Sequence, residues 1–184
     1  GKYVLSSSAM YATDCSAGTY QTTTGQTYCD DADAGYYVST IAQSSQTACA
    51  TGTYQALTGH TSCDDAYPGY YVSTTAQSNQ TACATGTYQA LTGQSSCDDA
   101  DVGYYVDETG QSSQIACASG TYQPVTGQTS CDDADAGYHV ATAGQSSQTA
   151  CEPGTFQPTT GQTSCADADA GYHVATAGQS NQTA

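Results

Sequence analysis

The sequence predicts an all-β protein built from small disulfide-pinned β-hairpin modules in a linear tandem repeat, which would form an elongated rod. Three observations support this class: regularly spaced cysteines, a self-similarity that runs through the chain, and a shortage of large aliphatic side chains. Only 38% of the 184 residues are hydrophobic, and that share includes sixteen tyrosines. A chain with this composition cannot build one conventional core. Its stability must come from cross-links and from packing between repeats.

The cysteines define the repeat. The gaps between the ten cysteines alternate between 14 and 20 residues without exception, which gives a period of 34. Helical repeats of this length need leucine-like residues at helical spacing, whereas the residues that recur here are Gly, Thr, Tyr, Gln and Ser, which suit short strands and turns. The period predicts five repeats, 15–48, 49–82, 83–116, 117–150 and 151–184, preceded by a half-repeat or N-terminal cap over 1–14.

Both ends of the sequence fall in register with this period. Residues 1–14 match the second half of a repeat, and a cysteine would be the next residue after Ala184. We therefore expect the C-terminal boundary to lie within a longer array. The divergent N-terminal half-repeat is typical of a capping end or of a mature start.

Each repeat divides into two halves of similar pattern. The first half reads CSAGTYQTTTGQTYC over 15–29, and the second reads ADAGYYVSTIAQSSQTAC over 32–49. Both place a glycine before an aromatic residue, then a Thr/Ser/Gly turn, then a glutamine shortly before a cysteine. This order predicts one small hairpin per half-repeat. We expect tyrosines such as Tyr20, Tyr36 and Tyr37 to supply much of the buried area, and neighbouring repeats to stabilise one another by stacking.

Ten cysteines in a chain this poor in apolar bulk indicate a disulfide scaffold from an oxidising, extracellular compartment. Structural zinc sites usually show closely spaced cysteine pairs, which are missing. Two periodic pairings are possible. The 20-residue scheme leaves Cys15 without a partner and Cys165 in need of one outside the chain. The 14-residue scheme uses every cysteine, joining Cys15–Cys29, Cys49–Cys63, Cys83–Cys97, Cys117–Cys131 and Cys151–Cys165.

The pattern C-x-x-G-T-Y…T-G-Q-x-x-C resembles the cysteine-rich repeats of tumour-necrosis-factor-receptor-type and ephrin-receptor-type ectodomains. The resemblance covers nearly the whole chain and implies a ladder of disulfide-pinned β modules exposed outside the cell. It also favours the 14-residue pairing. The family often carries C-x-x-C where this chain has CDDA, with alanine in the second position at residues 32, 66, 100, 134 and 168.

The charge balance excludes several partners. The chain has one Lys or Arg, seventeen Asp and Glu, and a formal net charge of −16. Binding to nucleic acid needs basic side chains that displace counterions from phosphate, so we expect no nucleic-acid partner. No stretch is apolar enough to span a bilayer, and we expect no membrane insertion within this segment.

The acidic segment CDDADAG after each first half is the one candidate metal site. Asp30, Asp31 and Asp33 could contribute oxygen ligands to calcium, which needs six to eight of them. Later copies lose a carboxylate, for example at Tyr67 and at Ala166, so we interpret the segment as a hydrated turn and keep calcium as the alternative. Apart from covalent glycans and this calcium alternative, we expect no cofactor.

No catalytic residue is predicted, and we expect the protein not to be an enzyme. Catalysis by a carboxylate needs an acid held in a pocket, and an exposed repeated turn supplies none. The three histidines are scattered substitutions within the repeat: His60 replaces a glutamine, and His139 and His173 replace a tyrosine.

The two asparagines of the chain, Asn79 and Asn181, both lie in the sequence N-Q-T, which is an N-glycosylation acceptor. They occupy the same position in their repeats, and we expect both to carry sugar. Serine- and threonine-rich turns also favour O-glycosylation. Together these features predict a structural extracellular glycoprotein, a secreted or cell-surface segment of a filament or fibril whose partners are copies of itself. The alternative is the stalk or ligand-binding ectodomain of an adhesion or receptor protein, with calcium as a possible ligand.

Overall fold

The computed structural model describes residues 1–4 and 11–184, and within these ranges it contains no helix, so none could cross a membrane. Twenty strands of two residues each pair into antiparallel hairpins, which confirms the all-β tandem architecture. The hairpins are β1 (Lys2–Tyr3) with β2 (Thr13–Asp14), β3 (Thr19–Tyr20) with β4 (Asp30–Asp31), β5 (Tyr36–Tyr37) with β6 (Thr47–Ala48), β7 (Thr53–Tyr54) with β8 (Asp64–Asp65), β9 (Tyr70–Tyr71) with β10 (Thr81–Ala82), β11 (Thr87–Tyr88) with β12 (Asp98–Asp99), β13 (Tyr104–Tyr105) with β14 (Ile115–Ala116), β15 (Thr121–Tyr122) with β16 (Asp132–Asp133), β17 (Tyr138–His139) with β18 (Thr149–Ala150), and β19 (Thr155–Phe156) with β20 (Ala166–Asp167).

Both halves of a repeat fold into the same hairpin. In β3–β4 the residue opposite Thr19 is Asp31, and in β5–β6 the residue opposite Tyr36 is Ala48, so the register is identical. The structural unit is therefore a hairpin of 17 residues, and the 34-residue period of the sequence holds two of them. The halves differ in one respect, because only the first contains a disulfide. We call them the bridged and the unbridged half-repeat.

The acidic segment differs from the predicted turn. Its first two acids, Asp30 and Asp31, form β4, the returning strand of the bridged hairpin. The turn begins only after Asp33, whose carbonyl accepts a hydrogen bond from the Tyr36 amide at 2.9 Å. A pair of aspartates is unusual in a strand, and here it is tolerated because both side chains remain exposed.

Small side chains form the buried core. One buried position alternates between cysteine and alanine, and a second alternates between glutamine and valine. The tyrosines of β3 and β5 are half-buried and lie around this core. The buried residues are Cys15, Ala32, Cys49, Ala66, Cys83, Ala100, Cys117, Ala134 and Cys151 at the first position, and Gln21, Val38, Gln55, Val72, Gln89, Val106, Gln123, Val140, Gln157 and Val174 at the second.

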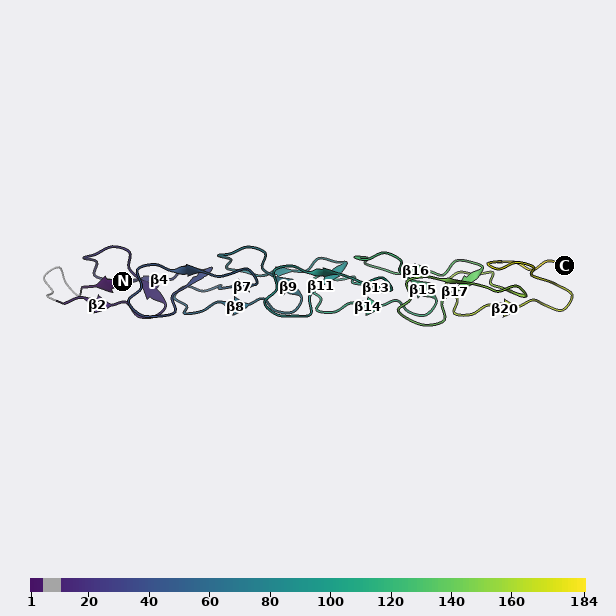
Figure 1. The fold of residues 1–184 in the computed structure, drawn as a ribbon, viewed down its shortest axis with the longest axis horizontal. Coiled ribbons are helices and arrows are strands. Elements are labelled where there is room, and N and C mark those ends of the chain that lie inside the picture. The colour runs from purple at the N-terminus through teal and green to yellow at the C-terminus, as the bar shows by residue number, and fades with distance from the viewer. Residues whose placement is uncertain (5–10) are drawn as a thin grey trace. The chain divides into compact units, whose positions relative to one another are not determined.

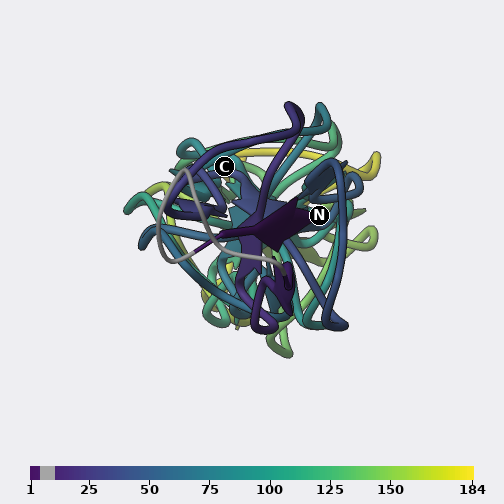
Figure 2. The same cartoon turned by 90° about the vertical axis from the view of Figure 1, so that its left-hand side faces the viewer.

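The hairpins fall into two compact units, residues 1–83 with 89–97 and residues 84–88 with 98–184. In each unit the ribbon colour advances gradually in Figure 1, since each hairpin lies beside its neighbour in sequence. The loops of the N-terminal unit project from the central strands in several directions in Figure 2.

Main-chain hydrogen bonds join consecutive hairpins in both units. In the first unit the Gly18 amide donates to the Val38 carbonyl at 2.8 Å, and the Ala42 amide donates to the Cys15 carbonyl at 2.8 Å. In the second unit the Gly120 amide donates to the Val140 carbonyl at 2.8 Å. These bonds use no side chain, so they are the same after a bridged and after an unbridged half-repeat.

Within each unit, hairpins also touch the next but one. A Cβ atom built on Gly120 would lie 2.4 Å from the carbonyl oxygen of Gly161, and Gly120 has a φ of +89°. Glycine is required there for two reasons, a left-handed backbone and a close approach of two main chains. Neighbour stacking is thus built from main-chain contacts between hairpins, with small residues holding them close.

Candidate functional site

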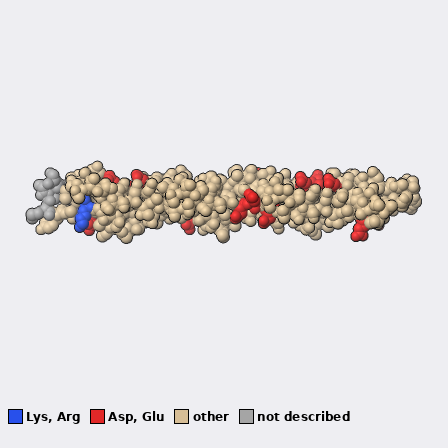
Figure 3. All heavy atoms as spheres, turned by 45° about the horizontal axis from the view of Figure 1, so that its top comes forward, with Lys and Arg blue, Asp and Glu red and all other residues tan. Residues whose placement is uncertain are grey.

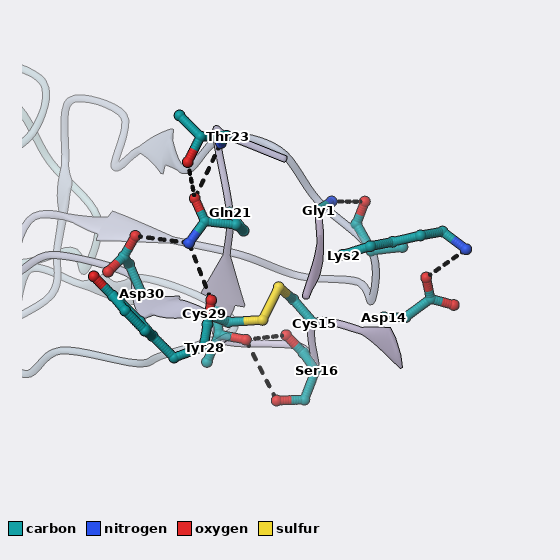
Figure 4. Close-up of a disulfide and its surroundings, with 12 residues drawn as sticks. Gly1, Lys2, Asp14, Cys15, Ser16, Gln21, Thr23, Tyr28, Cys29 and Asp30 are labelled. Carbon is teal, nitrogen blue, oxygen red and sulfur yellow. Dashed lines mark hydrogen bonds and ion pairs between the residues drawn. A yellow bond between two sulfur atoms is a disulfide. The ribbon is translucent and has the colours of Figure 1, made fainter. Parts of the chain in front are cut away.

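The five disulfides join the pairs of the 14-residue scheme, with Cα–Cα distances of 5.7 to 5.8 Å. No cysteine is free. Figure 4 shows the first of them, in which Cys15 and Cys29 lie next to the Lys2–Asp14 ion pair of 3.1 Å. The first cysteine of each pair is fully buried, and the second is half-buried. Each bridge therefore closes the base of a 17-residue hairpin from the inside.

A buried glutamine completes every bridged half-repeat. The Gln21 side-chain amide donates to the Tyr28 carbonyl at 3.0 Å, and its oxygen accepts from the Thr23 amide at 3.0 Å (Figure 4). One side chain thereby satisfies main-chain groups on both sides of the loop, which a buried loop needs. The same bond to the loop carbonyl recurs from Gln55, Gln89, Gln123 and Gln157.

The unbridged half-repeat carries a different device at the position of the disulfide. Ala32 fills the buried position of Cys15, and Gln46 takes the position of Cys29. The Gln46 oxygen accepts from the Asp33 amide at 2.7 Å, and its side-chain amide donates to the Asp33 carboxylate at 2.6 Å. We call this pair of hydrogen bonds the Asp–Gln clasp. It recurs between Asp101 and Gln114, Asp135 and Gln148, and Asp169 and Gln182.

The second repeat departs from this pattern. Tyr67 replaces the aspartate, so Gln80 accepts from the Tyr67 amide at 2.7 Å, and the tyrosine has no carboxylate to offer the glutamine amide. The Tyr67 side chain instead hydrogen-bonds Tyr54. Desolvation by burial raises the pKa of Tyr54 above 10.0, and the neighbouring Tyr67 hydroxyl adds to the shift. Tyr67 itself is 58% exposed.

The clasp was not expected from the sequence. Its signal is nonetheless present, because a glutamine stands 14 residues after each alanine at 32, 66, 100, 134 and 168, at the separation that joins the paired cysteines. The resemblance to receptor-type repeats places each alanine at the position of a second cysteine in a C-x-x-C pair. Aligning the two half-repeats on 17 residues places it over the first cysteine of the bridge.

The three carboxylates of an acidic segment go to three different partners. Asp30 lies 3.5 Å from the Gln21 side-chain amide, and Asp33 belongs to the clasp. Asp31 packs against Gly59 of the next bridged loop. A Cβ atom built on Gly59 would lie 3.5 Å from the Asp31 carboxyl group. The same contact recurs from Asp65 to Gly93, from Asp99 to Gly127 and from Asp133 to Gly161. On the face shown in Figure 3 the acidic side chains occur singly or in small groups along the surface, and the basic side chain in view lies at one end.

The first tyrosine of each bridged hairpin lies beside these acids. Burial raises the pKa of Tyr20, Tyr88 and Tyr122, and the neighbouring aspartates raise it further because a tyrosinate would repel them. Phe156 occupies the same position in the last repeat, so the hydroxyl is not needed for the fold.

Both predicted glycosylation sites lie on exposed loops. The side-chain amides of Asn79 and Asn181 each donate a 3.3 Å hydrogen bond to the hydroxyl of the preceding serine. Their side chains are exposed. A glycan at either asparagine would therefore displace no buried contact.

The histidines are not brought together. His60 is half-buried and offers its carbonyl to the Val38 amide at 3.0 Å, while His173 is exposed. His139 is the exception, since its Nδ1 atom lies 3.3 Å from the Sγ atom of Cys165. Among the described residues, His139, Cys151 and Cys165 are the one group of three His, Cys, Asp or Glu side chains whose ligand atoms lie within reach of a common ion.

Comparison with known proteins adds no relative. No protein-family model matches the chain, and no curated protein matches it significantly. The functional argument therefore depends on the repeated geometry described above.

Proposed function

We propose that this chain is a segment of a structural extracellular glycoprotein, in which stacked hairpins build a filament or a surface appendage. The observation that supports it most is the chain of main-chain hydrogen bonds from each hairpin to the next, as between Gly18 and Val38 or between Gly120 and Val140. Such contacts do not depend on side-chain identity, so they can be repeated without limit. A linear array of this kind extends by adding hairpins and needs no unique surface.

The proposed role is mechanical. Five disulfides close every second hairpin, and the Asp–Gln clasp closes most of the others, so most half-repeats resist local unfolding that starts in a loop. Disulfides of this number suit an oxidising compartment, which supports a secreted or cell-surface location. Glycans at Asn79 and Asn181 and a net charge of −16 would keep the surface hydrated. The role needs no catalysis, cofactor or nucleic acid; the proposed partner is a further copy of the same chain.

Electron microscopy of the native material, combined with its intact mass, tests this proposal. We expect filaments whose subunits are heavier than their own polypeptide by the mass of attached sugar. Compact monomers with the bare peptide mass would contradict it. Enzymatic removal of N-linked sugar from the same sample separates the two parts of the claim, because the filament should persist while the subunit mass falls.

The second candidate is the stalk or ligand-binding ectodomain of an adhesion or receptor protein, as the resemblance to receptor-type repeats implies. One observation favours it: the second repeat differs from its neighbours and presents an exposed Tyr67 where they hold a clasp. A receptor needs such a distinct repeat, and calcium could assist its binding. Thermal melting with and without a chelator tests the calcium part, since a large loss of stability supports it and an unchanged transition removes it.

A further inference from the structure

One disulfide has a neighbour that the others lack. His139 lies at the end of β17, and its Nδ1 atom is 3.3 Å from the Sγ atom of Cys165, the half-buried member of the Cys151–Cys165 bridge. The three side chains offer ligand atoms that all lie within 4.8 Å of one another. The imidazole comes from the preceding unbridged hairpin, so the group joins two hairpins of one unit.

We propose that reduction of the Cys151–Cys165 disulfide converts this group into a zinc site with two thiolates and one imidazole. A dithiol reductant supplies two electrons and two protons: the S–S bond breaks, each sulfur becomes a thiol, and the reductant is itself oxidised to a disulfide. Zinc then binds to Cys151, Cys165 and His139 Nδ1 and displaces the two thiol protons to solvent. Two sulfurs and one nitrogen form a ligand set that zinc prefers.

The hairpin is already arranged for this chemistry. Tetrahedral zinc holds sulfur at about 2.3 Å and nitrogen at about 2.0 Å, so its ligand atoms lie roughly 3.3 to 3.8 Å apart. The Cα atoms of the two cysteines are 5.7 Å apart, and rotation of the side chains separates the freed sulfurs to that range. The backbone need not move, because Cys151 remains held by main-chain bonds to Gly137 and Gly178, each of 2.9 Å. Three protein ligands leave the fourth position open to water.

The site is specific to one bridge of the five. The residue that stands 26 positions before the second cysteine is Tyr3, Tyr37, Tyr71 or Tyr105 in the other four repeats, and tyrosine is a poor ligand for zinc beside thiolates. The last bridge alone therefore combines a disulfide with an imidazole. The proposal is independent of the filament role, since it concerns the reduced form of one bridge.

Cobalt titration of the full chain tests the inference. The protein is reduced with a phosphine, Co²⁺ is added, and thiolate-to-metal charge-transfer absorption is followed, with Zn²⁺ then added to displace the cobalt. We expect one ion per chain in the reduced protein and none in the oxidised protein. His139→Tyr, which restores the residue found at the other bridges, should weaken binding more than tenfold, since loss of a ligand exceeds the effect of outer-shell changes. Tyr105→His is the matched gain, because it places an imidazole beside Cys117–Cys131 and should raise the count to two.

Three results would overturn the inference: no binding after reduction, binding that His139→Tyr leaves unchanged, or several ions per chain. The last would mean that the reduced chain has unfolded and binds metal through separated thiols. Circular dichroism of each reduced sample, recorded before cobalt is added, identifies that case directly.

Discussion

The bridged and unbridged half-repeats reach the same backbone with different chemistry. In the hairpin of β15–β16 the base is closed by Cys117–Cys131 and the loop is filled by the buried Gln123. In the next hairpin, β17–β18, Ala134 takes the buried cysteine position, Val140 takes the glutamine position, and the Asp–Gln clasp closes the base. The strand register and the main-chain bonds to neighbours are the same in both.

This comparison separates what specifies the hairpin from what stabilises it. The shared features are the left-handed glycine, the short strands and the main-chain bonds between hairpins, so these specify the fold. The disulfide and the clasp are alternative closures of one position. A disulfide restricts the unfolded chain and stabilises its hairpin more than a pair of exposed hydrogen bonds does. Strongly and weakly stabilised hairpins therefore alternate along the chain.

The largest effect should come from the shared glycine. Gly120→Ala in a bridged hairpin and Gly137→Ala in an unbridged one both place a Cβ 2.4 Å from a carbonyl oxygen, at Gly161 and at Gly178 respectively. We expect each to lower the free energy of unfolding by about 3 kcal/mol or more, from left-handed strain and overpacking together. Denaturant titration measures it.

The control for this prediction is Gly154→Ala. Gly154 has the same left-handed backbone, with a φ of +90°, but nothing within 4 Å of its Cβ position in this chain. It should lose only the strain, about 1 to 2 kcal/mol. Equal losses at all three glycines would show that the hairpins do not pack on their next-but-one neighbours.

Replacing one closure by the other sharpens the comparison further. Removing the bridge with Cys117→Ala and Cys131→Ala should cost about 3 kcal/mol, as expected for a closed loop of this length. Cys117→Ala, Ala118→Asp and Cys131→Gln together transplant the clasp into the bridged half-repeat and should recover about 1 kcal/mol. Thermal unfolding of the two variants measures the difference. A triple variant no more stable than the double one would mean that the two half-repeats are not interchangeable.

The Asp–Gln clasp should contribute less to the free energy of unfolding than a disulfide does, and its contribution should depend on the aspartate carboxylate. Gln114→Ala removes bonds of 2.6 Å to both the amide and the carboxylate of Asp101, for an expected loss of about 1 to 2 kcal/mol. Gln80→Ala removes only the bond to the Tyr67 amide and should lose about half as much. Parallel denaturant titrations compare them, and a larger loss at Gln80 would count against the carboxylate's part.

The smallest effect is a pH dependence confined to the bridged hairpins. Burial and then the charges of Asp135 and Asp132 raise the pKa of Tyr122 above 10.0. The folded state therefore favours the neutral phenol, so its contribution is complete below pH 10 and is lost as the pH rises through the folded-state pKa. Tyr122→Phe, which copies the natural Phe156, should make unfolding less sensitive to alkali. Melting temperatures across this range test it, and an unchanged slope would exclude Tyr122 as the source.

Much of the fold can be predicted from the sequence, because the cysteine spacing and the recurring glycine–aromatic pairs indicate hairpins. The residues of the core are harder to predict. The fully buried positions hold Cys, Ala, Val or a loop-filling Gln, with the tyrosines of β3 and β5 half-buried around them, because the main chains of neighbouring hairpins approach closely. That approach depends on contacts such as Gly120 with Gly161, which sequence patterns do not reveal.

The candidate sites show the same limit. The shared glycine–aromatic order of the two halves predicts one hairpin per half-repeat, but it does not align Ala32 with Cys15 or Gln46 with Cys29, because these positions differ in residue type. The sequence predicts a hydrated turn at Asp30 and Asp31, whereas their pairing with Tyr20 and Thr19 depends on the partner strand. The place of His139 beside a disulfide depends on how one hairpin packs on the next, which no spacing rule supplies.

The most direct test of the central claim is to build a sixth bridge where the clasp now stands. Ala134→Cys with Gln148→Cys places two cysteines at the buried and half-buried positions that Cys117 and Cys131 occupy one hairpin earlier. If the two half-repeats are one structural unit, the variant forms a sixth disulfide on oxidative folding, with no free thiol and the two new cysteines recovered in one linked peptide. Two free thiols at 134 and 148, or exchange with the neighbouring bridges, would contradict it.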